Sequence, residues 1–151
     1  MTVVDHGRMP KREAEVECDA RYCTTLDELP EISDVVSLHC PLTDQTRQLI
    51  EAKALSKMKD SAVLINTARG AVVDESALSD ALIHGEIAGA GLDVFVREPG
   101  VGDHFVSLDN VLLSPHVGTA TTETRDEMGL RVIENIKMFL STGQPIDKVE
   151  R

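Results

Sequence analysis

The sequence predicts an α/β fold: a parallel sheet with flanking helices. Short β-rich apolar runs alternate with longer segments of helical period, which indicates strands joined by crossover helices. Several of these runs are apolar throughout, as is typical of strands that are covered on both faces. A chain of 151 residues, of which 42% are hydrophobic and 27% charged, is expected to form one ordinary globular domain.

Five runs are predicted to be strands because they are short, apolar and separated by polar or turn-forming residues. They are Thr2 to Val4, Asp34 to His39, Ala62 to Asn66, Ala88 to Val94 and Val111 to Ser114. Helices are predicted between them: a short one ending in residues 56–59, a second from Asp74 to His84, and a long one from Thr121 to Leu140 that stops before Gly143.

The charge balance argues against nucleic-acid and membrane partners. There are 15 Lys and Arg residues against 26 Asp and Glu residues, so the formal net charge of -11 repels phosphate backbones and anionic lipids. No apolar run approaches the length of about 20 residues that a spanning helix needs, and the first residues do not resemble a signal peptide. Cys18, Cys23 and Cys40 are odd in number and lack metal-ligand spacing, so we expect reduced thiols, a cytoplasmic location and no metal site.

Three predicted strands are followed by side chains that can carry chemistry. Arg69 follows the third strand, Glu98 the fourth and His116 the fifth. Parallel α/β sheets bind ligands at the carboxyl ends of their strands. Taken singly, each residue is more often a surface or structural residue than a functional one. Together they supply a carboxylate clamp, an acid and a titratable imidazole, which are the parts needed to reduce a 2-keto acid.

Four sequence motifs, in order, resemble the signatures of the D-isomer-specific 2-hydroxyacid dehydrogenases. They are Ser37-Leu38-His39-Cys40-Pro41-Leu42-Thr43, Asn66-Thr67-Ala68-Arg69-Gly70, Gly91-Leu92-Asp93-Val94-Phe95 with Glu98-Pro99, and Pro115-His116-Val117-Gly118. The intervals of 29 residues from Arg69 to Glu98 and 18 from Glu98 to His116 match that family. Within it, residues 7–10 and 118–125 most resemble glyoxylate/hydroxypyruvate reductases.

The resemblance implies an oxidoreductase that transfers hydride between NAD or NADP and a small 2-keto or 2-hydroxy acid. Arg69 is then expected to bind the substrate carboxylate and to polarise the adjacent carbonyl. His116 is expected to protonate the carbonyl oxygen, and Glu98 to orient the imidazole and favour its charged form. The nicotinamide cofactor supplies the redox chemistry.

The resemblance also implies a set of cofactor contacts. Asp93 is expected to bind the nicotinamide carboxamide, and the backbone of Thr67, Ala68 and Arg69 to line the same ring. Cys40 and Pro41 are expected to flank the adenosine half, with His116 and Gly118 beside the cofactor. After the first strand, Asp5 suits a ribose hydroxyl and so NAD, whereas Arg8 suits a 2′-phosphate and so NADP, and the sequence leaves both open.

The family pattern is incomplete in this chain, because none of the ten glycines forms the Gly-x-Gly-x-x-Gly loop that binds a pyrophosphate. Residues 1–151 therefore resemble an incomplete nucleotide-binding domain that begins at the second Rossmann strand, without the substrate domain. Because the absent strand normally joins two halves of the sheet, we expect a partial Rossmann-like sheet, marginal folding and weak cofactor binding.

A second hypothesis remains open beside the enzyme: a catalytically inactive remnant that forms a homodimer or pairs with a full-length relative. A nucleotide-binding module of another class is disfavoured, because it has no need of Arg69, Glu98 and His116 at these intervals.

Overall fold

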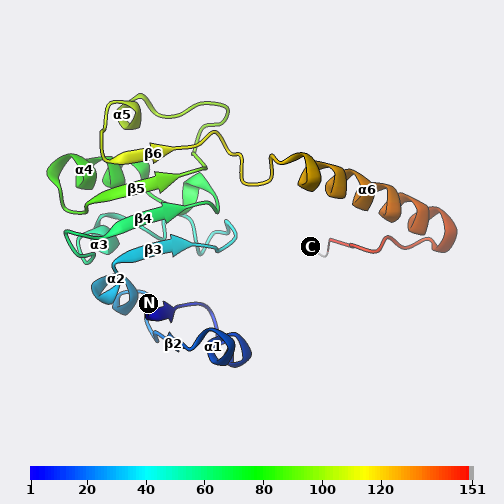
Figure 1. The fold of residues 1–151 in the computed structure, drawn as a ribbon, viewed down its shortest axis with the longest axis horizontal. Helices are drawn as coiled ribbons and strands as arrows, with labels where there is room; N and C mark the ends of the chain where they lie inside the picture. Colours follow the sequence, from blue (N-terminus) through cyan, green and yellow to red (C-terminus); the bar gives the residue numbers. More distant parts are fainter. Residues whose placement is uncertain (150–151) are drawn as a thin grey trace. The chain divides into compact units, whose positions relative to one another are not determined.

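The computed structural model describes residues 1–149 and divides the chain into two compact units, Met1–Pro115 and His116–Arg151. Figure 1 shows the elements, which follow one another along the chain as alternating strands and helices. In order they are β1 (Val3–Asp5), α1 (Arg12–Cys18), β2 (Ala20–Tyr22), α2 (Glu28–Ile32), β3 (Val35–Leu38), α3 (Ala52–Leu55), β4 (Val63–Asn66), the 3₁₀ helix η1 (Gly70–Val72), α4 (Glu75–His84), β5 (Gly89–Leu92), α5 (Asp103–Val106), β6 (Val111–Leu113) and α6 (Thr122–Thr142).

The first unit contains two parallel sheets. β1 pairs with β2, and the other four strands lie in the order β3-β4-β5-β6. Each strand of the larger sheet therefore pairs with its neighbour in sequence, across a connection that contains a helix. This arrangement confirms the α/β fold with a parallel sheet. Among the described residues no strand pairing joins the two sheets.

The core of the first unit lies on one face of the larger sheet. Helices α3 and α4 contact each other and cover this face, as Figure 1 shows. Leu55 and Leu78 of these helices are fully buried with Leu64 of β4 in one apolar cluster. Along β3 the burial alternates, with Val36 4% exposed and Val35 60% exposed. The alternation follows from the two-residue period of a strand, and it leaves the opposite face open in this unit.

The main predicted elements are present, with shifted ends. The second predicted helix is confirmed as α4, and its N-cap is Asp74, whose Oδ1 accepts hydrogen bonds from the N–H groups of Ser76 and Ala77 at 3.1 Å each. The first predicted helix ends earlier than expected, at Leu55. Strand β1 extends to Asp5, whereas β5 ends at Leu92.

The prediction missed β2, α1, α2 and α5. All four are short, and α2 contains a proline. A segment of three to seven residues offers too few periods for a hydrophobic pattern to be recognised.

The second unit is dominated by α6, which begins after the N-cap Thr121 and ends at Gly143, a residue with the left-handed φ of 76°. This end confirms the predicted stop before Gly143. The following segment folds back on the helix through Asp147, whose carboxylate accepts from Arg131 Nε at 2.6 Å and Nη2 at 2.7 Å. The side chain of Asn135 donates to the same carboxylate and accepts from the Asp147 N–H, each at 2.8 Å.

Candidate functional site

The carboxyl end of β4 is organised by the side chain of Asn66, which is 1% exposed. Its Oδ1 accepts a hydrogen bond from the Ala68 N–H at 3.1 Å, and its Nδ2 donates to the Arg69 carbonyl at 3.0 Å. An asparagine amide carries an acceptor and two donors on a short stem, so one side chain can satisfy both sides of a tight turn. Asn66 therefore fixes the backbone from which Arg69 projects.

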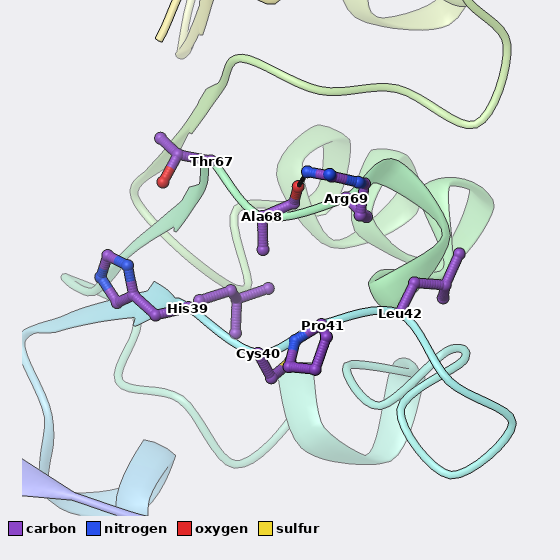
Figure 2. A pocket seen from close by; sticks show the side chains of 8 residues that line it. His39, Cys40, Pro41, Leu42, Thr67, Ala68 and Arg69 are labelled. Carbon is purple, nitrogen blue, oxygen red and sulfur yellow. Dashed lines mark hydrogen bonds between the residues drawn. The ribbon is translucent and has the colours of Figure 1, made fainter. Parts of the chain in front are cut away.

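The side chain of Arg69 is exposed and therefore accessible to a ligand. Its backbone is extended, with φ -151° and ψ 142°, and it precedes η1 directly. Its Nη1 donates to the neighbouring Ala68 carbonyl at 2.6 Å, which folds the guanidinium against the turn (Figure 2). Rotation of this flexible side chain frees the guanidinium for a carboxylate, to which it can donate two parallel hydrogen bonds.

A pocket of about 530 Å³ lies between the ends of β3 and β4. It is lined by residues 38–42 and 67–69, and Figure 2 shows these two segments facing each other. The pocket follows from the topology, because Leu38 pairs with Asn66 and the two parallel strands release their chains at the same edge. The structure thus brings together five of the residues predicted to bind a cofactor: Cys40, Pro41, Thr67, Ala68 and Arg69.

Asp93 and Glu98 lie at the carboxyl end of β5, which pairs with β4. Asp93 directly follows the strand and is 9% exposed, and its N–H donates to the Asn66 carbonyl at 3.0 Å. Glu98 is exposed, and its Oε1 accepts from the Phe95 N–H at 3.0 Å. The carboxylate of Glu98 is therefore hydrogen-bonded to the backbone of its own loop.

His116 and Gly118 belong to the second unit, which begins where the chain leaves β6. His116 has a φ of 54°, in the left-handed region that non-glycine residues seldom adopt. Such conformations concentrate at functional positions, because the local strain persists only where the surrounding structure enforces it.

Asp5 is the last residue of β1 and Arg8 follows it by three residues. The two side chains differ in their exposure to solvent. The Oδ1 atom of Asp5 is buried and has no hydrogen-bond partner among the described residues. Arg8 is exposed, and Lys11 and Arg12 follow it closely, at the start of α1. A second pocket, of about 690 Å³, is lined by residues 9–13. The chain after β1 is therefore an exposed, positively charged segment in a protein whose net charge is negative.

Sequence reasoning missed three residues that shape the site: Asn66, Gly70 and Glu75. Asn66 and Gly70 lie within the motif that contains Arg69. The available signal for Asn66 was a polar residue at the end of an otherwise apolar strand. Glu75 follows the N-cap Asp74, whose pKa is lowered by hydrogen bonds from the Ser76 hydroxyl and the Ala77 N–H. The hydrogen bond that Glu75 accepts from the Val96 N–H could not be recognised in the sequence.

The described residues do not contain a group of three or more His, Cys, Asp and Glu side chains placed to hold a metal ion. None of the helices in residues 1–149 has both the length and the apolar character needed to cross a membrane.

The fold and the site define a Rossmann-like α/β domain whose candidate ligand-binding residues Cys40, Pro41, Thr67, Ala68 and Arg69 gather at the carboxyl edge of its parallel sheet. Comparison with protein families identifies that domain. Residues 1–118 match the NAD binding domain of the D-isomer specific 2-hydroxyacid dehydrogenases. The chain belongs to this family.

The individual relatives are consistent with that assignment. A glyoxylate reductase from Aeropyrum pernix is 45% identical over 100% of this chain and 45% of its own length. A glyoxylate/hydroxypyruvate reductase B from Pectobacterium carotovorum is 48% identical over 93% of this chain and 44% of its own. The crystal structure of an NADPH-dependent glyoxylate/hydroxypyruvate reductase from Sinorhizobium meliloti, with NADP and malonate, matches 99% of this chain and 46% of its own at 39% identity and a TM-score of 0.92. The chain spans less than half the length of these relatives.

Proposed function

We propose that this chain is the nucleotide-binding part of an NADP-preferring reductase of small 2-keto acids of the glyoxylate or hydroxypyruvate type. The observation that carries the proposal is Arg69, whose exposed side chain lines the pocket between β3 and β4 and whose backbone carbonyl accepts a hydrogen bond from the buried Asn66. The malonate bound to the Sinorhizobium meliloti relative is a small carboxylate, the kind of ligand that an arginine clamp recognises.

Arg69, Glu98 and His116 are proposed as the catalytic residues. Arg69 binds the substrate carboxylate and draws electron density from the neighbouring carbonyl. His116 donates a proton to the carbonyl oxygen as the keto group is reduced, and Glu98 orients the imidazole and stabilises its charged form. When bound, the reduced nicotinamide supplies the hydride. The family intervals between these three residues support the assignment.

The residues around the pocket fit a nicotinamide cofactor by their chemistry. Backbone groups of Thr67 and the carboxylate of Asp93, at the end of the neighbouring strand β5, are the proposed polar partners, with Ala68 beside them. Cys40 and Pro41 offer an apolar wall. We assign the nicotinamide half to the first group and the adenosine half to the second, and we propose His116 and Gly118 as cofactor-binding residues from the family motif alone.

NADP is proposed over NAD because the two candidate residues after β1 differ in exposure. One carboxylate oxygen of Asp5 is buried by the protein, whereas Arg8, Lys11 and Arg12 are exposed cations suited to a 2′-phosphate. The NADPH dependence of the Sinorhizobium meliloti relative agrees with this choice.

The experiment that tests the proposal is calorimetric titration of the protein with NADPH and NADH, followed by turnover assays with glyoxylate and hydroxypyruvate. We expect tighter binding of NADPH, and loss of that preference in Arg8→Ser. Arg69→Ala is expected to reduce kcat/KM by at least about 100-fold, because it removes the carboxylate clamp. Arg47→Ala, at an exposed arginine outside the pocket, is the matched control. Equal binding of both cofactors would refute the NADP preference, and full turnover by Arg69→Ala would refute the clamp.

The alternative is an inactive remnant that pairs with a full-length relative, and no contact in the described residues favours it over the enzyme.

We propose that the domain associates as a two-fold dimer, which sedimentation would test. The three cysteines are free thiols, which supports a cytoplasmic location. Residues 1–151 are proposed to form part of one nucleotide-binding domain whose substrate domain lies outside this sequence.

A further inference from the structure

The loop that carries Glu98 is exposed over residues 96–100, between the buried Phe95 and the partly buried Val101. Val94 and Phe95 are 2% and 6% exposed, whereas Val96 is 54% exposed and the residues that follow it are exposed as well. Glu98 therefore lies in a segment without regular secondary structure and without apolar anchors of its own. Hydrogen bonds to this exposed stretch therefore contribute to fixing its position, because exposed loops with few contacts open easily.

One such hydrogen bond comes from a different element. The Val96 N–H donates to Oε1 of Glu75, the first residue of α4, at 2.7 Å. Within the loop, the Phe95 N–H donates to Oε1 of Glu98 at 3.0 Å. Two consecutive N–H groups are thus bound by two carboxylates, one from α4 and one from the loop itself. The hydrogen bond to Glu75 comes from Val96, the first exposed residue after the buried Phe95.

The turn that carries Arg69 touches the same loop. Gly70 lies so close to the Phe95 carbonyl group and the Val96 nitrogen that a Cβ atom at this position would collide with them. The contacts are to backbone atoms, which cannot move aside as a flexible side chain would. The segment from Gly70 to Glu75 therefore contacts the start of the loop at two points, by close packing of Gly70 against Phe95 and by the hydrogen bond from Val96 to the carboxylate of Glu75.

The geometry points to Glu75 as a positioning residue: its carboxylate ties the loop after β5 to the start of α4 and thereby sets the place of Glu98 relative to Arg69. This inference rests on the proposed function, in which Glu98 and Arg69 act on the same substrate. A carboxylate suits the task because a charge-assisted hydrogen bond to an N–H is stronger than a neutral one. The amino end of a ten-residue helix also stabilises a negative charge.

The core on either side does not depend on this bond. Glu75 is half-buried, its N-cap neighbour Asp74 fixes the helix start by its own hydrogen bonds, and Val94 and Phe95 are buried without it. Replacing Glu75 is therefore expected to loosen the exposed part of the loop and to leave the fold intact.

The test compares Glu75→Ala and Glu75→Gln with the control Asp80→Ala, which removes an exposed carboxylate from the same helix. Amide exchange by NMR is the first measurement, because it does not require turnover. In Glu75→Ala we expect exchange at both Val96 and Phe95 to accelerate by about tenfold or more, since loosening the loop also releases Glu98 from the Phe95 N–H. Glu75→Gln retains an acceptor and should restore part of the protection. Asp80→Ala should match the wild type.

Steady-state kinetics are the second measurement. In Glu75→Ala we expect kcat to fall about tenfold while the KM values for keto acid and NADPH stay within about twofold, because the loop is misplaced but the binding groups remain. Unchanged exchange at Val96, or faster exchange at Val96 with Phe95 still protected, would overturn the inference, as would unchanged kcat with a loosened loop. If the wild type of this chain shows no turnover, exchange at Val96 and Phe95 decides alone whether Glu75 positions Glu98, whereas failure to bind either NADPH or NADH would refute the proposed function.

Discussion

At the scale of single residues, two positions next to Arg69 do more for the site than their chemistry suggests. Asn66 uses its acceptor and one donor to hold the turn between Ala68 and Arg69. A buried amide without hydrogen-bond partners lowers the stability of the fold by about 1–3 kcal/mol. The turn must therefore offer a donor and an acceptor to the side chain of Asn66. Gly70 contributes only by lacking a side chain.

Substituting Gly70 by alanine tests that requirement. The added Cβ would collide with the backbone of Phe95, and overpacking of this kind costs about 1–3 kcal/mol. We expect a lower urea midpoint for Gly70→Ala and faster amide exchange in the loop after β5. The matched control is Gly129→Ala within α6, where the new methyl group has no atom within 4 Å apart from its chain neighbours and the backbone of its own helix. Because alanine favours a helix over glycine by about 1 kcal/mol, this control should be neutral or stabilising.

At the scale of elements, α2 is joined to α3 and the turn after it by ion pairs. Lys57 lies 2.9 Å from Asp27 and 3.0 Å from Glu31, and Lys53 lies 3.3 Å from Asp27. The pKa of Asp27 is lowered, chiefly by the hydrogen bonds from Lys57 and then from Lys53. The pKa of Lys57 is raised by the same two carboxylates, Asp27 first. The contact between α2 and α3 therefore has an electrostatic part in addition to the packing of Leu29 against the core.

This contact predicts a specific dependence of stability on pH. Because the pKa of Asp27 in the folded protein lies below its ordinary value of 3.8, its contribution is present above that value and is lost as pH falls through the folded pKa. Asp27→Asn should therefore lower the urea midpoint at pH 7 and have a diminishing effect in acid. Added salt should also reduce the difference, because the pair is exposed to solvent. Asp44→Asn, an exposed loop aspartate, should show neither trend.

Sequence reasoning was most successful where elements are long or strongly apolar. The α4 and α6 segments and the strands of the larger sheet were predicted, because each has a clear hydrophobic period or run. Strand β2 escaped because Ala20-Arg21-Tyr22 offers one pair of inward-facing side chains around an exposed arginine. The role of Glu75 escaped for a different reason: its partner lies 21 residues away, and no local pattern encodes that distance.

At the scale of the whole molecule, the question is whether a domain with two separate sheets binds its cofactor. The pocket between β3 and β4 and the cations after β1 are present, but the sequence has no Gly-x-Gly-x-x-Gly loop. The relatives carry more than half of their length outside the region matched by this chain. We therefore expect this chain to bind the pyrophosphate of the cofactor more weakly than a domain with that loop.

Thermal unfolding with and without cofactor measures that consequence directly. A ligand that binds only the folded form at 100 times its Kd stabilises it by about 2.7 kcal/mol. We expect NADPH to raise the Tm and NADH to raise it less at the same concentration. Arg8→Ser should abolish the difference between the two cofactors while leaving the Tm without ligand unchanged. Identical curves with and without NADPH would show that these residues need further chain to bind it.

The strand order β3-β4-β5-β6 has a consequence for the way the protein is made. Because spatial order equals chain order, each strand pairs with one that has already left the ribosome. The sheet can grow by one strand and one covering helix at a time during synthesis, without waiting for a distant segment. The turn carrying Arg69 emerges before the loop carrying Glu98, so the first is in place as a template when the second arrives.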